Sequence, residues 1–287
     1  MQSEQFQLHA DIEQRHWWFR GRRTIMRRLV ERIVPGGRPG GRPLVIDVGC
    51  GTGANIAALA TDYRCVGIDT SAEAIDRAGR RYPGVDFRVG LAPDDLEDCL
   101  GEARLVMLMD VLEHVPDDFA LLSRLLAASR PGTQFLITVP ADLDLWSEHD
   151  ESFGHWRRYD MDRFMRLWRD LPVEPRLVSH YNARLYPVVR HIRRRNRRRG
   201  HSQGAAGTDF TIPARPINAM LERIFAGEAR RLGRQLEDRK AVPYRQGVSL
   251  IAVLRRTTGS IEPFVKPADI ASDYFDPIAG ELIAAVS

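Results

Sequence analysis

The sequence predicts an α/β fold built on a parallel β-sheet. Two observations carry this prediction. Short apolar segments rich in β-branched residues alternate with segments of helical period, and a glycine-rich turn directly follows the first apolar segment. Strands that alternate with helices in this way are joined by right-handed crossovers. The 287 residues, 44% hydrophobic and 28% charged, suit one globular core with an elaboration.

The first 35 residues are predicted to form an N-terminal helical cap. The segment TIMRRLVERIV places apolar residues at helical spacing, with charged residues on the other face; the apolar set is Ile25, Met26, Leu29, Val30 and Ile33. The proline- and glycine-rich segment 35–43 interrupts regular structure, so we expect a linker there.

Five strands and three helices are predicted to follow. The strands are expected at 44–48, 65–69, 85–90, 104–110 and 133–140. The helices are expected at 54–61, 71–82 and 117–130, and Ser71 is the expected N-cap of the second. Ligands of parallel sheets bind beyond the carboxyl ends of the strands, so the loops after the first, second and fourth strands should carry the chemistry.

After residue 140 the pattern changes. Two more strands are predicted at 174–182 and 246–256, which brings the sheet to seven strands, and a helix at 217–237 lies between them. The chain is therefore divided into a cap (1–35), a core (44–182 and 246–256), a helical insertion (183–245) and a loosely attached C-terminal tail (257–287).

Composition favours a cytoplasmic protein. No segment approaches the roughly 20 apolar residues that span a bilayer, and the polar N-terminus has no apolar signal-peptide core. The cysteines Cys50, Cys65 and Cys99 lack the paired spacing of metal ligands and fit a reducing compartment. We therefore expect no bound metal.

The net charge of +4 and the pI near 9.2 come almost entirely from arginine. Residues 187–200 hold the one concentrated basic run, with seven arginines between Arg190 and Arg199. The run is either a solvated helix end or a surface for phosphate groups, including peripheral contact with a membrane.

The strongest motif is VIDVGCGTG, residues 45–53, in which Gly49, Gly51 and Gly53 follow a strand and precede a helix. Glycine there allows a tight turn and close approach of a ligand. The GxGxG spacing differs from the GxGxxG of dinucleotide sites. Asp69 ends the second strand, where its carboxylate can accept both hydroxyls of a ribose.

VIDVGCGTG, GID and MDVLEHVPD, in this order over residues 44–140, resemble the class I S-adenosylmethionine-dependent methyltransferases. The resemblance implies a Rossmann-like seven-stranded sheet, with S-adenosylmethionine as cofactor and S-adenosylhomocysteine as product. It implies that the Gly49–Gly53 turn cradles the methionine and ribose and that Asp47 supports the turn. Asp69 would bind the ribose hydroxyls, with Thr70 beside the adenosine and Asp110 and Val111 along the methionine.

The loop after the third strand departs from the family pattern. Many relatives have Gly-Asp-Ala there, whereas this chain has Gly90, Leu91 and Ala92. The carboxylate that often contacts the adenine amine is missing, so Asp94, Asp95 or the backbone amides of Leu91 and Ala92 are the candidates to replace it.

EQRHWWFRGRR (13–23) resembles a segment ahead of the core in a bacterial subgroup of these enzymes. The resemblance implies a helix over the cofactor mouth, with Trp17 and Trp18 as its wall and Arg22 at the methionine carboxylate. The alternative is that the aromatic residues only anchor the helix in the core, which we favour for Phe19.

The same subgroup carries a motif like HD…GHxRRY after the fifth strand, reproduced here between His149 and Tyr159. A general base helps methyl transfer to a hydroxyl or an ammonium. The candidate bases are His114, His149 and His155, and the candidate substrate-binding residues are Arg158, Tyr159, Tyr181 and Tyr186. Each assignment has an alternative. His114 could instead pack against the turn after the fourth strand, and Arg158 and Tyr159 could instead hold the loop in place. A metal site formed by His149, Asp150 and His155 is the least favoured alternative.

Together these patterns predict methylation of a small molecule at oxygen or nitrogen, in small-molecule biosynthesis. The insertion should shape the acceptor site, and its arginine run suits an acceptor that bears a phosphate or lipid chain, or a natural-product intermediate. A nucleic-acid methyltransferase is less favoured, since no Asn/Asp-Pro-Pro-aromatic motif follows the fourth strand. A non-catalytic binding protein of this fold is the other alternative.

Overall fold

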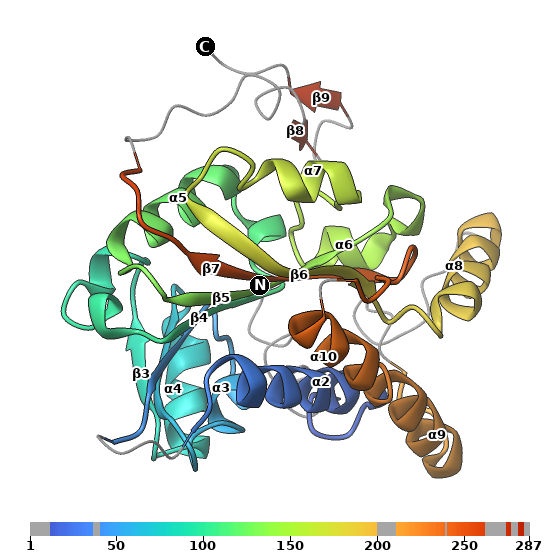
Figure 1. Cartoon of the computed structure of the whole chain (residues 1–287). Coiled ribbons are helices and arrows are strands. Elements are labelled where there is room, and N and C mark those ends of the chain that lie inside the picture. Colours follow the sequence, from blue (N-terminus) through green and yellow to red (C-terminus); the bar gives the residue numbers. More distant parts are fainter. Residues whose placement is uncertain are drawn as a thin grey trace.

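A seven-stranded sheet lies at the centre of the fold, with helices on both faces (Figure 1). The computed structural model describes residues 12–36, 41–199, 211–238, 240–261, 274–276 and 281–283. Every strand of the sheet overlaps one predicted from the sequence. The strands are β1 (Leu44–Val48), β2 (Arg64–Asp69), β3 (Asp86–Val89), β4 (Leu105–Met109), β5 (Gln134–Pro140), β6 (Val173–Tyr181) and β7 (Ser249–Arg256).

The strand order is β3-β2-β1-β4-β5-β7-β6. Strands β1 to β5 pair in parallel, whereas β7 runs antiparallel to both β5 and β6. The sequence did not indicate the direction of β7, because the alternation of side chains along a strand is the same in parallel and antiparallel pairs. The winding reverses between β1 and β4, so ligands are expected beyond their carboxyl ends.

Helices cover the two faces of the sheet unequally. They are α2 (Trp17–Ile33), α3 (Ala54–Ala57), α4 (Ala72–Arg81), α5 (Asp118–Ala128), α6 (Glu148–Ser152), α7 (Met161–Arg166), α8 (Tyr186–Arg199), α9 (Arg215–Ala226) and α10 (Ala229–Glu237). Ile46 of β1 belongs to the apolar cluster that includes α5 and α7. Val45 points to the opposite face, into a cluster with α2, α3, α4, α9 and α10. Asp47 shares the face of Val45, since alternate strand residues point the same way.

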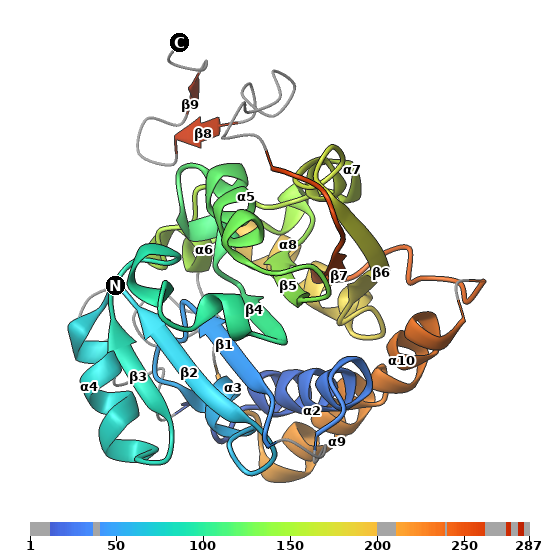
Figure 2. The same cartoon turned by 60° about the vertical axis from the view of Figure 1, so that its left-hand side comes forward.

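The N-terminal cap and the insertion form one layer, although about 200 residues separate them. Figures 1 and 2 both show α2 alongside α9 and α10. The Trp17 amide donates to Asn218 Oδ1 at 2.9 Å, and Asn218 Nδ2 donates to the Arg15 carbonyl at 2.9 Å. Gly21 permits this packing, because a Cβ there would lie 2.6 Å from Phe225 Cδ1.

Two predicted helices have different bounds in the structure. The helix expected at 54–61 is limited to α3, and the one expected at 217–237 is divided into α9 and α10. The division places the buried carboxylate of Glu228 where it accepts the amides of Ala183 and Arg184, each at 2.9 Å. This contact joins the insertion to the end of β6.

Most of the predicted C-terminal tail lies outside the described residues. Within it, β8 (Tyr274–Asp276) and β9 (Glu281–Ile283) pair antiparallel. Among the residues described, no helix combines the length and apolar character needed to cross a membrane.

Candidate functional site

A cavity of about 840 Å³ lies beyond the carboxyl ends of β1, β2 and β4. One end, called the turn end below, is lined by the glycine turn, α2 and the loops after β2 and β3; it includes Trp17, Trp18, Arg22, Gly49, Gly51, Asp69, Thr70, Gly90, Leu91, Ala92, Asp110 and Val111. The other, called the histidine end, is lined by the segments after β4 and β5 and by α8; it includes Glu113, His114, His149, Phe153, His155, Arg158, Val188, Val189, Ile192 and Arg193.

The glycine turn depends on backbone that other residues adopt at a cost. Gly49, Gly51 and Gly53 have φ of 68°, 53° and 82°. A Cβ on Gly49 would lie 2.7 Å from Val111 Cγ2, and one on Gly53 would lie 2.5 Å from Phe87. A Cβ on Gly51 would meet nothing within 4 Å. Gly49 and Gly53 therefore serve packing, and Gly51 leaves room in the cavity for a ligand.

Asp69 is held by the backbone at both carboxylate oxygens. Oδ2 accepts the Gly51 amide at 2.8 Å, and Oδ1 accepts the Ser71 amide at 2.9 Å. Ser71 is also the N-cap of α4, as expected, since its side chain accepts the Ala74 amide. A carboxylate fixed in this way at the rim of the cavity suits ribose hydroxyls.

Asp47 lies beneath the turn and does not line the cavity. It is 1% exposed, and neither carboxylate oxygen has a hydrogen-bond partner among the described residues. Burial raises the pKa of Asp47 to about 7, an effect that Arg22 opposes and Asp69 reinforces. Its support of the turn stays a prediction, since no described residue donates a hydrogen bond to its carboxylate.

Arg22 closes the turn end from α2. Its guanidinium forms an ion pair with Asp110 and lies 4.4 Å from the centroid of the Trp18 ring. Asp110 has a positive φ of 61°, and its Oδ1 accepts the Thr138 hydroxyl at 2.9 Å. Arg22 thus pairs with a carboxylate of the protein, and its contact with the methionine carboxylate of the cofactor stays a prediction. Phe19 is 2% exposed, as expected for a core anchor, and it also lines the cavity.

The acidic side chains of the loop after β3 make contacts outside the cavity. Asp95 Oδ2 accepts the Leu91 amide at 2.7 Å, and Asp94 pairs with Arg124 on the surface. Neither carboxylate is among the residues that line the cavity, whereas Gly90, Leu91 and Ala92 do line it. The carboxylates of Asp94 and Asp95, predicted as adenine contacts, therefore lie outside the cavity lining. The Leu91 amide, another predicted contact, already donates its hydrogen to Asp95.

The histidine end is organised around the buried carboxylate of Asp150. The segment Ser147–Asp150 forms a capping box at the start of α6, in which Asp150 accepts the Ser147 amide. Asp150 also contacts His155 Nδ1 at 2.9 Å and accepts from Arg158 Nε at 2.9 Å. Burial alone would raise the pKa of Asp150, but Arg158 and His155 hold it well below its usual range. Asp150 is therefore an ionised anchor with no oxygen to spare for a metal.

The three candidate bases come together. The rings of His114 and His155 lie 4.6 Å apart and nearly perpendicular, and those of His149 and His155 lie 6.4 Å apart. Burial, with a contribution from His155, lowers the pKa of His114 to about 3. Burial and the charge of Arg193 also lower the pKa of His149. Both imidazoles are therefore neutral near pH 7.

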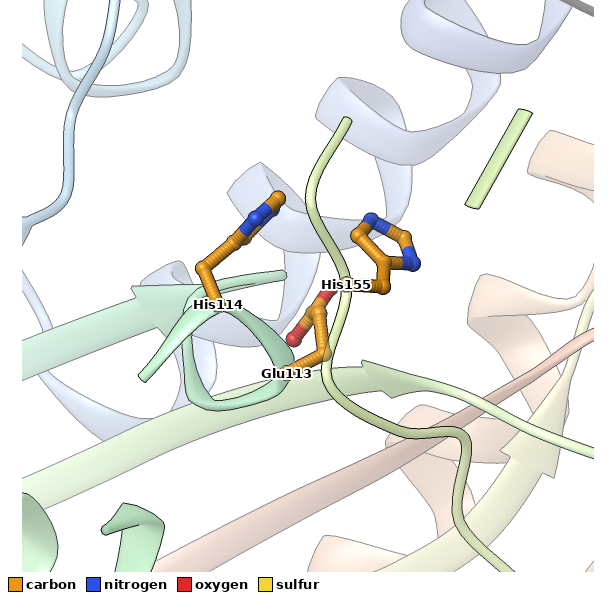
Figure 3. A group of neighbouring side chains, drawn as sticks. All are labelled: Glu113, His114 and His155. Carbon is orange, nitrogen blue, oxygen red and sulfur yellow. The ribbon is translucent and has the colours of Figure 1, made fainter. Parts of the chain in front are cut away.

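Glu113 is a residue of this end that the sequence argument overlooked. It stands inside MDVLEHVPD, next to His114, and its carboxyl group is fully buried beside the histidine rings (Figure 3). Burial, and then the charge of Asp110, raise its pKa. The available signal was an acidic residue directly next to the candidate base His114.

Three predicted substrate-binding residues are corrected, because none of them lines the cavity. Tyr159 is fully buried and donates to Asp118 Oδ2 at 2.8 Å, so it pins the loop. Tyr181 is 1% exposed and stacks on Phe225, with ring centroids 5.7 Å apart. Tyr186 donates to Asp142 Oδ2 at 2.6 Å. Arg158 does line the cavity, with its guanidinium held by Asp150 and the Ala141 carbonyl.

The arginine run divides between two sides of α8. Arg193 lines the cavity and donates to the Leu145 carbonyl at 2.6 Å. Arg190 and Arg194 instead pair with Asp144 at the surface. The side chains of residues 197–200 lie outside the described set.

Comparisons with known proteins agree on one family. The model of a family described as "Methyltransferase domain" matches residues 18–184. A probable S-adenosylmethionine-dependent methyltransferase of Mycolicibacterium smegmatis is 30% identical over 131 residues, 45% of this chain and 48% of the relative. Trans-aconitate 2-methyltransferase of Deinococcus radiodurans is 35% identical over 104 residues, 35% of this chain and 39% of the relative.

A third relative, the 2-methyl-6-phytyl-1,4-hydroquinone methyltransferase of Synechocystis sp., is 28% identical over 66% of this chain and 55% of its own. The chain thus spans between 39% and 55% of the length of these relatives. Among solved structures, the plantazolicin methyltransferase BamL in complex with S-adenosylhomocysteine has a TM-score of 0.50 at 15% identity, covering 83% of this chain and 86% of its own. The [4+2]-cyclase SpnF has a TM-score of 0.50 at 16% identity, covering 83% and 81%. These two likenesses show the fold.

Proposed function

The chain belongs to the methyltransferase domain family, with S-adenosylmethionine as its cofactor, and we propose that it methylates a small-molecule acceptor at oxygen or nitrogen. The observation that carries this proposal is that one cavity joins a turn end suited to a nucleoside to a histidine end with neutral bases. The relatives from D. radiodurans and Synechocystis sp. carry the names of small-molecule methyltransferases, which supports the acceptor class.

The residues of the turn end fit the cofactor. Gly51 leaves open space at the turn, and Asp69 presents a fixed carboxylate beside it. Trp18 and Arg22 cover the mouth from α2. When bound, S-adenosylmethionine supplies the methyl group on a sulfonium that reacts by in-line displacement. The protein contributes orientation and the exclusion of water.

At the histidine end, His155 is placed to accept a proton. Its Nδ1 lies 2.9 Å from Asp150 Oδ1, and with Nδ1–H donating to Asp150 the nitrogen that faces an acceptor is Nε2. Asp150 then stabilises the imidazolium formed when Nε2 takes a proton from an acceptor hydroxyl or ammonium. His149 and His114 are the alternative bases on the same wall.

The acceptor is expected to combine an apolar body with an anionic group. Val188, Val189 and Ile192 present apolar surface from α8, and Arg193 brings a cation to the same wall. An acceptor that carries a phosphate or carboxylate next to an apolar chain or ring fits this pairing.

Calorimetry with S-adenosylmethionine tests the cofactor assignment. Asp69→Ala should weaken binding about 10- to 100-fold, the equivalent of losing charge-assisted hydrogen bonds. Asp76→Ala is the matched control, since Asp76 pairs with Arg80 on the exposed face of α4. Wild-type protein that binds no S-adenosylmethionine would contradict the proposal.

The acceptor assignment is tested with Arg193→Gln, in an assay that detects S-adenosylhomocysteine over a panel of anionic small molecules. We expect the KM for the acceptor to rise about tenfold, with unchanged affinity for the cofactor. Arg194→Gln controls for charge, because Arg194 pairs with Asp144 outside the cavity. Equal effects of both variants would argue against an anionic acceptor group at Arg193.

A further inference from the structure

Three side chains with metal-binding atoms converge at the histidine end. Glu113 and His114 come from the 3₁₀ turn after β4 (Leu112–His114), and His155 comes from the segment after α6. One carboxylate oxygen and one nitrogen from each ring lie within 4.8 Å of one another. Figure 3 shows the three side chains gathered from these two segments, and all three line the cavity.

Glu113 is the observation that points to a ligand. Its side chain is fully buried, and neither carboxylate oxygen has a hydrogen-bond partner in the described part of the chain. An ionised carboxylate is strongly disfavoured in a buried site without partners, so such a group is normally protonated, paired or bound to a metal. Arg22 and Arg158 lie near enough to act on Glu113 through space, but neither donates a hydrogen bond to it.

His155 has the support that metal-bound histidines usually have. Its Nδ1 is held at 2.9 Å by Asp150 Oδ1, which fixes the ring and leaves Nε2 as the free ligand atom. A carboxylate behind the second nitrogen is the common outer contact of a metal-bound imidazole. Asp150 is itself held by Arg158 Nε and Nη2, so the orientation of the ring is set by a rigid, buried pair.

The charge around the cluster is mixed. Arg158 and Arg193 disfavour a cation there, whereas Asp150 and Asp110 offset them, and Glu113 contributes the one carboxylate among these that is not hydrogen-bonded. Asp150 is fully engaged, so the set His149, Asp150 and His155 weighed from the sequence is not the candidate.

We propose that Glu113, His114 and His155 bind a divalent transition-metal ion of the zinc class, with coordination positions left open toward the cavity. Two imidazoles and one carboxylate are a ligand set for such ions, and three protein ligands leave room for water or a substrate oxygen. The ion would neutralise Glu113 and hold an oxygen of the acceptor beside the turn end. While it is bound, His114 and His155 are ligands, so the base among the three histidines would be His149. This role toward the acceptor rests on the proposed function, whereas the binding of the ion does not.

The test uses the untagged full chain, freed of metal with a chelator and titrated with Zn²⁺ by calorimetry. We expect one Zn²⁺ per chain at this site, and Glu113→Gln and His155→Gln should each weaken its binding at least about tenfold. Glu148→Gln and His191→Gln are matched controls, because both residues are exposed and outside the cluster, and they should bind as the wild type does. Equal Zn²⁺ affinity of Glu113→Gln and the wild type would overturn the proposal.

X-ray absorption of the zinc-loaded wild type provides a measurement that depends on no variant. We expect scattering from two imidazole rings, with a Zn–N distance of about 2.0–2.1 Å. A spectrum without imidazole scattering, or no stoichiometric uptake, would sink the proposal. Calorimetry with S-adenosylmethionine, read separately, distinguishes this failure from a failure of the proposed function.

Discussion

The two ends of the cavity differ in the groups that shape them: backbone groups at the turn end and charged side chains at the histidine end. At the turn end, backbone amides hold Asp69, and glycine conformations shape the wall. At the histidine end, His155 and Arg158 from the segment after β5 and Arg193 from α8 are held together by Asp150. The turn end therefore depends on local sequence, whereas the histidine end depends on contacts between residues that are distant in the chain.

Two buried carboxylates, Asp150 at the histidine end and Asp47 beneath the glycine turn, differ in their hydrogen-bond partners. Asp150 has at least three partners and a pKa below its usual range, whereas Asp47 has no hydrogen-bond partner among the described residues and a raised pKa. Removing the charge should therefore have opposite effects on stability at the two positions.

Asp150→Asn should produce the largest effect. It removes one partner of a buried pair and leaves Arg158 uncompensated, which typically costs about 3–5 kcal/mol of unfolding free energy. Urea denaturation at pH 7 measures the loss. Asp144→Asn is the control, since its pairs with Arg190 and Arg194 are exposed, and exposed pairs contribute about 0–1 kcal/mol. Losses of the same size in both variants would break the comparison.

Asp47→Asn should raise the free energy of unfolding relative to the wild type, and only at higher pH. The unfolded carboxyl ionises near its ordinary pKa of 3.8, and the folded one near about 7. The unfolded state therefore gains stability as pH rises between these values, and the wild type should lose about 3 kcal/mol of unfolding free energy from pH 5 to pH 8.

The asparagine does not titrate, so Asp47→Asn should lack this loss. The measurement is urea denaturation of the cofactor-free wild type and variant at pH 5 and pH 8. Asp76→Asn should follow the wild type at both. If the unfolding free energies of the wild type and Asp47→Asn change by the same amount between pH 5 and pH 8, Asp47 is not the group that titrates.

Gly49→Ala should have the smallest of the three effects. The substitution combines a φ of 68° with a Cβ only 2.7 Å from Val111 Cγ2, so we expect a loss of about 2 kcal/mol in urea denaturation, with weaker cofactor binding. Gly79→Ala in α4 meets no neighbour and should stabilise by about 0.5–1 kcal/mol. Adding Val111→Ala should relieve the clash but not the backbone strain; full recovery would mean that the conformation at Gly49 costs nothing.

The sequence was a good guide where a function depends on neighbours along the chain. The strand β1, the turn after it and Asp69 at the end of β2 were all readable from short motifs. Tyr159, Tyr181 and Tyr186 were misplaced, because a polar aromatic residue near a site looks the same in the sequence whether its hydroxyl faces the cavity or a buried carboxylate such as Asp118.

The sequence by itself determined the α/β fold, the positions of the seven strands, the glycine turn and the identity of the candidate bases. Hydrophobic period and turn chemistry are local properties, and they are written in consecutive residues. Only the tertiary structure decided the antiparallel direction of β7, the pairing of Arg22 with Asp110, and the meeting of Glu113, His114 and His155. Each of these joins segments that are remote in the chain, and their contacts are fixed by packing and by the pairing of buried charges.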